Sequence, residues 1–79
     1  MIPNESEIKK DSELVLRIME HAPRSKFSEI QIGSGLKEVR LCCALIYLLR
    51  HDHIRQEMCD DGIYYCINFQ TISRTNRRL

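Results

Sequence analysis

Long apolar runs are missing from this chain of 79 residues. A transmembrane helix needs about 20 consecutive apolar residues, and no segment approaches that length. The stretch Met1 to Asp11 is polar and acidic, whereas a secretory signal has a cationic start followed by a long apolar stretch. We therefore expect a soluble cytoplasmic protein that does not contact a membrane, and a chain of this size forms one domain.

Motifs of catalysis and of phosphate binding are also missing. The glycine-rich stretch Gly33-Ser34-Gly35 lacks the following lysine and the preceding strand of a phosphate-binding loop. Histidines are present, but no serine, cysteine or carboxylate forms a recognisable nucleophile motif with them. The sequence therefore predicts that this protein is not an enzyme, and it predicts no small-molecule substrate and no cofactor.

The spacing of the cysteines does not match a structural zinc site, which has two short pairs of ligands. Cys42 and Cys43 are adjacent on an expected helix and point about 100° apart, so they do not easily share one metal ion. Cys59 and Cys66 fit no paired spacing. We expect no metal site, and we expect reduced cysteines that act as small apolar residues.

The chain also lacks a large excess of charge of one sign. Its formal net charge is +1 at pH 7. This value argues against a protein that relies mainly on electrostatic attraction to nucleic acid. Residues 71–79 differ, since they contain Arg74, Arg77 and Arg78 without an acidic residue. We expect a basic disordered tail there, which either aids solubility or neutralises phosphates.

The chain does contain the periodic apolar residues of amphipathic helices. After a flexible lead, residues 1–11, Ser12 can act as the N-cap of a first helix that Pro23 ends. Apolar residues on one face of this helix follow the 3.6-residue repeat: Leu14, Val15, Ile18 and Met19. This face can pack in a core, and the helix also offers a dimer surface.

A short second helix is expected over about residues 28–34. Ser28 and Gln31 have the spacing of a capping box, and Ile30 and Ile32 supply buried contacts. Glycines then permit a sharp reversal of the chain.

The third helix is expected from about Lys37 to His51, with Leu36 filling the angle between the helices. Its core stripe has spacings of four and three residues: Leu41, Leu45 and Leu48.

An antiparallel hairpin is expected after the third helix. With Asp61-Gly62 as the central residues of a type I′ turn, Met58 pairs with Tyr65. The same register pairs Gln56 with Ile67 and Ile54 with Phe69. It also places Cys59 opposite Tyr64, so Cys59 and Cys66 are not disulfide partners.

The chain has a family resemblance in the order of its expected elements. That order is helix, extended link, helix, turn, helix and hairpin. The residues that carry it lie between Phe27 and Gln56: Phe27-Ser28-Glu29-Ile30, Gly35-Leu36, Leu41, Leu45, Leu48 and Ile54. This pattern resembles the winged helix-turn-helix of small bacterial transcription regulators. In size and in the leucine-rich stretch Leu45-Ile46-Tyr47-Leu48-Leu49, the chain is most similar to the PapI and FaeA group of fimbrial-operon regulators.

The resemblance implies a mainly α fold with a small β-hairpin (α+β) over residues 12–70, with three helices and a two- or three-stranded antiparallel wing. It also implies a sequence-specific transcriptional regulator whose third helix enters the major groove of double-stranded DNA. Arg40 then donates two hydrogen bonds to guanine, and Lys37 meets a phosphate. The other expected DNA-binding residues are Arg24, Lys26, Ser28, Cys43, Arg55, Arg74, Arg77 and Arg78.

Other residues of the third helix favour a protein partner instead. Cys42, Cys43 and Ala44 occupy its middle, where none can make a strong bidentate contact with a base. Phosphates would also repel Glu38 and the pair Asp60-Asp61.

The third helix also carries apolar residues outside its leucine stripe: Val39, Cys43, Ile46 and Tyr47. They either belong to the core or mark a partner surface. The alternative function is therefore a winged-helix protein-interaction module, a dimeric adaptor or a small inhibitor that does not bind DNA. Its partner is a second copy or another regulatory protein.

Overall fold

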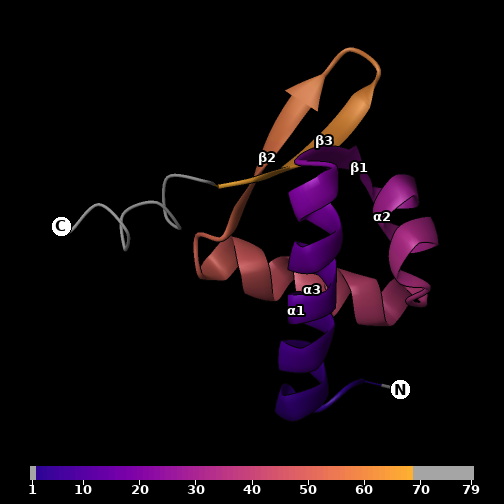
Figure 1. Ribbon diagram of the computed structural model, residues 1–79, viewed down its shortest axis with the longest axis vertical. Coiled ribbons are helices and arrows are strands. Elements are labelled where there is room, and N and C mark those ends of the chain that lie inside the picture. The colour runs from indigo at the N-terminus through magenta and orange to yellow at the C-terminus, as the bar shows by residue number, and fades with distance from the viewer. Residues whose placement is uncertain (1, 69–79) are drawn as a thin grey trace, which may run out of the picture.

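The computed structural model describes residues 2–68, so the expected tail contacts at Arg74, Arg77 and Arg78 lie outside the described residues. Along the chain the elements are α1 (Glu5–His21), β1 (Arg24–Lys26), α2 (Phe27–Ser34), α3 (Glu38–Arg50), β2 (Ile54–Cys59) and β3 (Gly62–Ile67) (Figure 1). The expected class, mainly α with a small antiparallel β part, is therefore confirmed. No helix within residues 2–68 is both long enough and apolar enough to cross a membrane.

Helix α1 begins earlier than the sequence predicted. The side chain of Asn4 accepts a hydrogen bond from the backbone N–H of Glu7 at 2.8 Å, and the Glu7 carboxylate accepts one from the N–H of Asn4 at 3.0 Å. This reciprocal pair is a capping box with Asn4 as the N-cap. Residues 5–11, expected within a flexible lead, therefore form the first turns of α1, and Ser12 lies inside the helix and not at its cap.

Helix α2 also begins differently from the expectation. Its N-cap is Lys26 and not Ser28, and the Glu29 carboxylate accepts a hydrogen bond from the Lys26 N–H at 2.8 Å. The helix ends at Ser34, and its C-cap is Gly35, whose φ of 73° lies in the left-handed region that favours glycine. Gly33 has another role, because a Cβ there would lie 3.3 Å from Cγ2 of Ile18. Gly33 therefore lets α2 pack closely on α1.

The core lies where α1 crosses α3 and where both helices meet the base of the sheet. Its buried residues are each exposed by 3% or less: Val15, Met19, Ile30, Leu41, Ala44, Leu45, Leu48, Ile54 and Ile67. The expected leucine stripe of the third helix is therefore confirmed. Ile32 is 84% exposed, so the expectation of its burial is wrong. It follows Ile30 by two residues and so points to the opposite side of α2.

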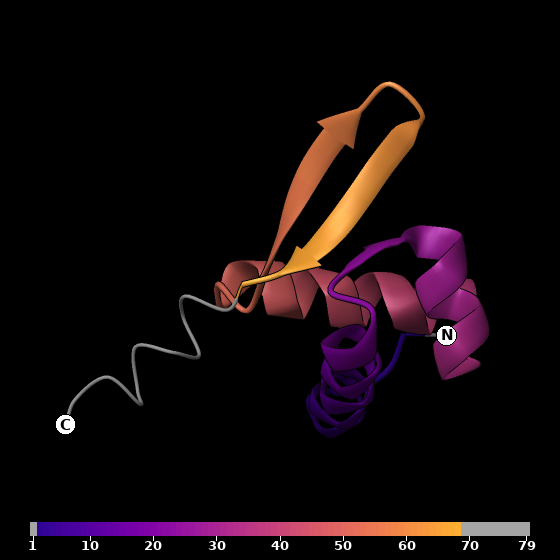
Figure 2. The same ribbon diagram turned by 45° about the horizontal axis from the view of Figure 1, so that its top comes forward.

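The sheet has three antiparallel strands in the order β1-β3-β2, and the β2–β3 hairpin projects beyond the helices (Figures 1 and 2). In the observed register Met58 pairs with Ile63 and Gln56 pairs with Tyr65. The expected partner of Met58 was Tyr65, so the expected register is wrong by two residues. Because side chains alternate with a period of two, this shift leaves every side chain on its expected face of the sheet.

The tip of the hairpin consists of Asp60 and Asp61, since Cys59 pairs with Gly62. A type I′ turn needs positive φ at both central residues, and among the described residues Asp52 is the only non-glycine with positive φ. The expected turn is therefore wrong. Gly62, with φ 135°, follows the tip in a conformation that needs glycine. Cys59 does not face Tyr64, and all four cysteines are free, as expected.

Candidate functional site

The turn before α3 presents the first residues of that helix to solvent. The backbone N–H of Leu36 donates to Oγ of Ser34 at 3.2 Å, and Nε2 of Gln31 donates to the Leu36 carbonyl at 3.3 Å. These contacts hold the chain between α2 and α3. Lys37, the N-cap of α3, and the residues 38–39 that follow it are exposed.

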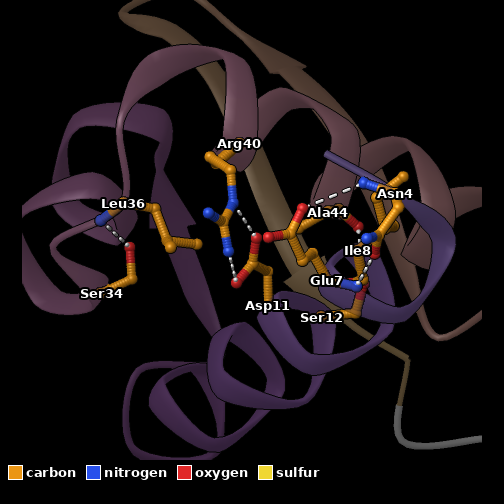
Figure 3. Close-up of polar contacts among 9 residues, drawn as sticks. All are labelled: Asn4, Glu7, Ile8, Asp11, Ser12, Ser34, Leu36, Arg40 and Ala44. Carbon is orange, nitrogen blue, oxygen red and sulfur yellow. Dashed lines mark hydrogen bonds and ion pairs between the residues drawn. The ribbon is translucent and has the colours of Figure 1, made fainter. Parts of the chain in front are cut away.

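Arg40, the expected reader of guanine, is held against α1 (Figure 3). Its Nε donates to Oδ2 of Asp11 at 2.7 Å, and its Nη2 donates to Oδ1 at 2.9 Å. The Asp11 side chain is 6% exposed and that of Arg40 is 38% exposed. The hydrogen bond to Asp11 raises the pKa of Arg40. Two of the Arg40 N–H groups that were expected to contact DNA therefore already donate to Asp11.

Ser12 lies beside this pair, at the crossing of α1 and α3 (Figure 3). Its Oγ donates to the Ile8 carbonyl at 2.7 Å and lies 3.4 Å from the carbonyl oxygen of Ala44. Both Ser12 and Ala44 are buried. Ala44, expected on the DNA-facing side of the third helix, is instead a packing residue that lets the two helices approach closely.

The expected cations of the sheet all have acidic partners. Nε of Arg24 lies 3.2 Å from Oε1 of Glu57, and Nη2 of Arg55 lies 3.3 Å from Oε2 of the same carboxylate. Nζ of Lys26 lies 3.6 Å from Oδ2 of Asp61. These side chains share one face of the sheet, where opposite charges alternate and no continuous cationic rim forms.

Tyr64 connects the two parts of this charged face. The guanidinium carbon of Arg24 lies 3.9 Å from the centre of the Tyr64 ring, and the Tyr64 hydroxyl donates to Oδ2 of Asp61 at 2.8 Å. That hydrogen bond raises the pKa of Tyr64 and lowers the pKa of Asp61. The hydrogen bond from Arg24 lowers the pKa of Glu57. Sequence reasoning missed Tyr64 and Glu57 as a cross-strand pair because its register was displaced.

The remaining expected DNA-binding residues in the described part of the chain are separate from this network. Ser28 is exposed in the first turn of α2, where the Glu29 carboxylate already accepts from the Lys26 N–H. Lys37 is exposed and makes no ion pair with any residue between 2 and 68. Cys43 is half-buried on α3. Within residues 2–68, none of these three residues forms a hydrogen bond or ion pair with the side chains of the sheet network.

The outer face of α3, defined here as Val39, Cys42, Cys43 and Ile46, is apolar. Val39 is 50% exposed and Ile46 is 53% exposed, and Cys42 is exposed between them. The sequence left open whether Val39, Cys43, Ile46 and Tyr47 belong to the core. Val39 and Ile46 are exposed and Cys43 is half-buried, whereas Tyr47 packs against the core. The outer face borders a groove of about 410 Å³ between α1 and α3, whose walls include Ile8, Tyr47 and Arg50.

Within residues 2–68, no group of three or more His, Cys, Asp or Glu side chains is placed to hold a metal ion. No protein-family model, no curated protein and no solved structure matches this chain. The function must therefore be inferred from the residues of α3 and of the hairpin.

Proposed function

We propose that this chain is a winged-helix protein-interaction module whose third helix contacts a protein and not DNA. The element order and the pairing of β1 with β3 support the winged-helix assignment. The left-handed Gly35 lies between α2 and α3, where a helix-turn-helix has its turn, and the projecting β2–β3 hairpin has the place of a wing (Figure 2).

The observation that carries the proposal is the apolar character of the outer face of α3. A winged helix that reads DNA turns this face of its third helix to the base edges, which are recognised by hydrogen-bond donors and acceptors. Val39 and Ile46 have no polar side-chain atom, and a cysteine thiol is a weak donor. Burial against another protein would instead remove apolar area from water, which contributes a favourable free energy of about 25 cal/mol per Å².

The ion pairs around α3 and on the sheet support the same conclusion. Arg24, Arg40 and Arg55 each contact a carboxylate, so each would leave an acidic partner before it neutralised a phosphate. For Arg40 the exchange is unfavourable, because it would leave the buried Asp11 carboxylate without its cation.

One observation favours DNA binding as the second candidate function. Lys37 is exposed at the start of α3 and has no acidic partner within residues 2–68. A phosphate contact by Lys37 would contribute a slope of about −0.9 to the logarithmic salt dependence of binding. This single cation does not outweigh the apolar surface beside it.

Selection from a pool of random duplex DNA at low salt tests the proposal. We expect no sequence to be enriched, and we expect any residual binding to be equal across sequences and to disappear as salt is added. Enrichment of one sequence would contradict the proposal, and a lower affinity of Lys37→Ala for that sequence would place the DNA contact at the start of α3. Arg50→Ala serves as the matched control, since Arg50 is also an exposed cation of α3 but lies at the other end of the helix.

A further inference from the structure

Strand β2 forms an open edge of the sheet. The strand order is β1-β3-β2, so β2 has β3 on one side, and no strand within residues 2–68 pairs with its other side. The opposite edge is β1, which has three residues, whereas β2 has six. An open edge presents N–H and C=O groups that can pair with the backbone of another chain.

The pairing with β3 shows which residues of β2 present these groups. The backbone N–H of Asn68 donates to the His53 carbonyl at 2.8 Å, so the pair 53–68 is hydrogen-bonded. Hydrogen-bonded and non-hydrogen-bonded pairs alternate along an antiparallel ladder. In the same register, positions 55, 57 and 59 therefore bond to β3. The residues whose N–H and C=O groups point away from β3 are Ile54, Gln56 and Met58.

Strand β2 lacks several features that protect edge strands from pairing. It contains no proline and no lysine, and its register with β3 runs through all six residues without a bulge. Its charged side chains are Arg55 and Glu57, which lie on one face of the sheet because side chains alternate along a strand. The order of these two charges is complementary to itself when two copies of the strand run antiparallel.

The charges favour one register for such a pair. With a two-fold axis at Gln56, Arg55 of each strand lies directly opposite Glu57 of the other. A shift by two residues in either direction would place Arg55 opposite Arg55 or Glu57 opposite Glu57, and like charges directly opposite are destabilising. The register at Gln56 also puts the free groups of Ile54, Gln56 and Met58 at hydrogen-bonded positions. Arg55 and Glu57 then form the non-hydrogen-bonded pairs, whose Cα atoms are only about 4.5 Å apart.

We propose that β2 pairs with β2 of a second copy of this chain, antiparallel and about a two-fold axis at Gln56, so that the two sheets join into one. Each Glu57 then lies between Arg24 of its own chain, whose Nε is 3.2 Å away, and Arg55 of the second copy. Met58, which is 80% exposed in the single chain, comes beside Ile54 of the second copy. A two-fold interface of this kind uses the same residues twice and closes on itself. The inference goes beyond the proposed function, since it does not involve the outer face of α3.

Helix α1, which the sequence offered as a dimer surface, has its apolar face in the core. Val15 and Met19 are both fully buried against the other helices and the sheet. The apolar residues of α1 are therefore already covered, whereas the backbone groups at the free edge of β2 are not paired with any strand of the described part of the chain.

A proline at the axis tests the edge pairing. Sedimentation of the full-length chain over a concentration series should show a monomer–dimer equilibrium whose dissociation constant rises at least about tenfold in Gln56→Pro. Proline removes the N–H of residue 56, which points away from β3, so the ladder within the chain keeps its hydrogen bonds.

Gln56→Ala is the matched control for the proline. Both variants lose the hydrogen bond from Nε2 of Gln56 to the Tyr65 hydroxyl, but alanine keeps the backbone N–H. The alanine variant should dimerise as the parent does, and thermal melting should show that both variants are folded. Equal dimerisation of the two variants would overturn the edge pairing.

Two charge variants test the register. Arg55→Glu has acidic residues at both positions and Glu57→Arg has basic residues at both, so each variant alone should dimerise at least about tenfold more weakly than the parent. An equimolar mixture should form a heterodimer, because every charge then lies opposite one of the other sign. A mixture that sediments as monomers would overturn the register at Gln56.

Hydrogen exchange of the backbone amides tests where the two copies meet. The amides of Gln56 and Met58 should exchange fast in dilute protein and more slowly as the concentration rises, whereas those of Arg55 and Glu57 should be protected throughout by β3. A chain that stays monomeric at every concentration would overturn the inference, and so would a dimer in which Gln56 and Met58 exchange as fast as in the monomer. Neither result bears on the contact proposed for α3, which the selection from random duplex DNA tests separately.

Discussion

The inner and outer faces of α3 have different surroundings although both are apolar. On the inner face, Leu41, Leu45 and Leu48 are buried against α1, β2 and the rest of the core. On the outer face, Val39 and Ile46 remain half-exposed one or two residues away. The same helix therefore has one face that holds the domain together and another that nothing in the described part of the chain covers.

The difference shows that the residue types on a helical face indicate what that face contacts. A helix that served only the core would place charged or polar side chains on its outer side. Here the polar side chain next to the inner face, Arg40, is paired with Asp11, and the outer face has apolar residues and thiols. The outer face of α3 is therefore the part of the domain best suited to a protein contact.

Truncation on the two faces should give the largest difference in stability. Leu45→Ala removes buried methyl groups and leaves a cavity, so the free energy of unfolding should fall by about 2–5 kcal/mol. Ile46→Ala, on the outer face, should change it by no more than about 0.5 kcal/mol in dilute monomeric protein. Urea unfolding measures both values. Equal losses for the two neighbouring residues would mean that the outer face belongs to the core.

Substitution of two arginines of α3 should give a smaller difference in stability. The larger loss is again expected at the residue that contacts the rest of the domain. Arg40→Met removes the partner of the buried Asp11 carboxylate, so the midpoint of urea unfolding should fall. Arg50→Met should leave that midpoint unchanged, because Arg50 is exposed at the outer end of α3. An unchanged midpoint in both variants would show that the Arg40–Asp11 contact does not stabilise the packing of α1 on α3.

Thiols on the outer face of α3 should be alkylated faster than thiols in the buried interior. This difference is expected without any change in the stability of the fold. Cys42 is exposed, whereas burial raises the pKa of the Cys66 thiol and keeps it protonated to higher pH. Maleimide should therefore label Cys42 before Cys66, and the rate at Cys66 should still be rising at pH values above its ordinary pKa. Peptide mass spectrometry gives the order of labelling, and faster reaction at Cys66 would contradict the buried position of β3.

Much of the fold could be predicted from local patterns. The leucine spacing of α3 and the residue alternation in the hairpin placed these elements correctly because both depend on burial of one face. The start of α1 was missed although Asn4 and Glu7 have the spacing of a capping box. Residues 5–11 contain a single apolar residue, Ile8, so apolar periodicity gave no sign of a helix there.

The candidate site depends on contacts that no local pattern contains. Asp11 and Arg40 are 29 positions apart in the sequence, and only the crossing of α1 and α3 brings them together. The partnership of Glu57 with Arg24 needs the correct hairpin register and the pairing of β1 with β3. The turn chemistry of Asp61-Gly62 suggested another register, because Gly62 was assigned to the tip and in fact follows it.

The outer face of α3 is proposed to contact a protein and not DNA. Amide NMR spectra of the labelled full-length protein, recorded as random duplex DNA is added, test this proposal. The signals of Val39, Cys42 and Ile46 should shift no more than that of Ile32, which lies on α2. Shifts that are confined to the outer face and persist as salt is added would contradict the proposal.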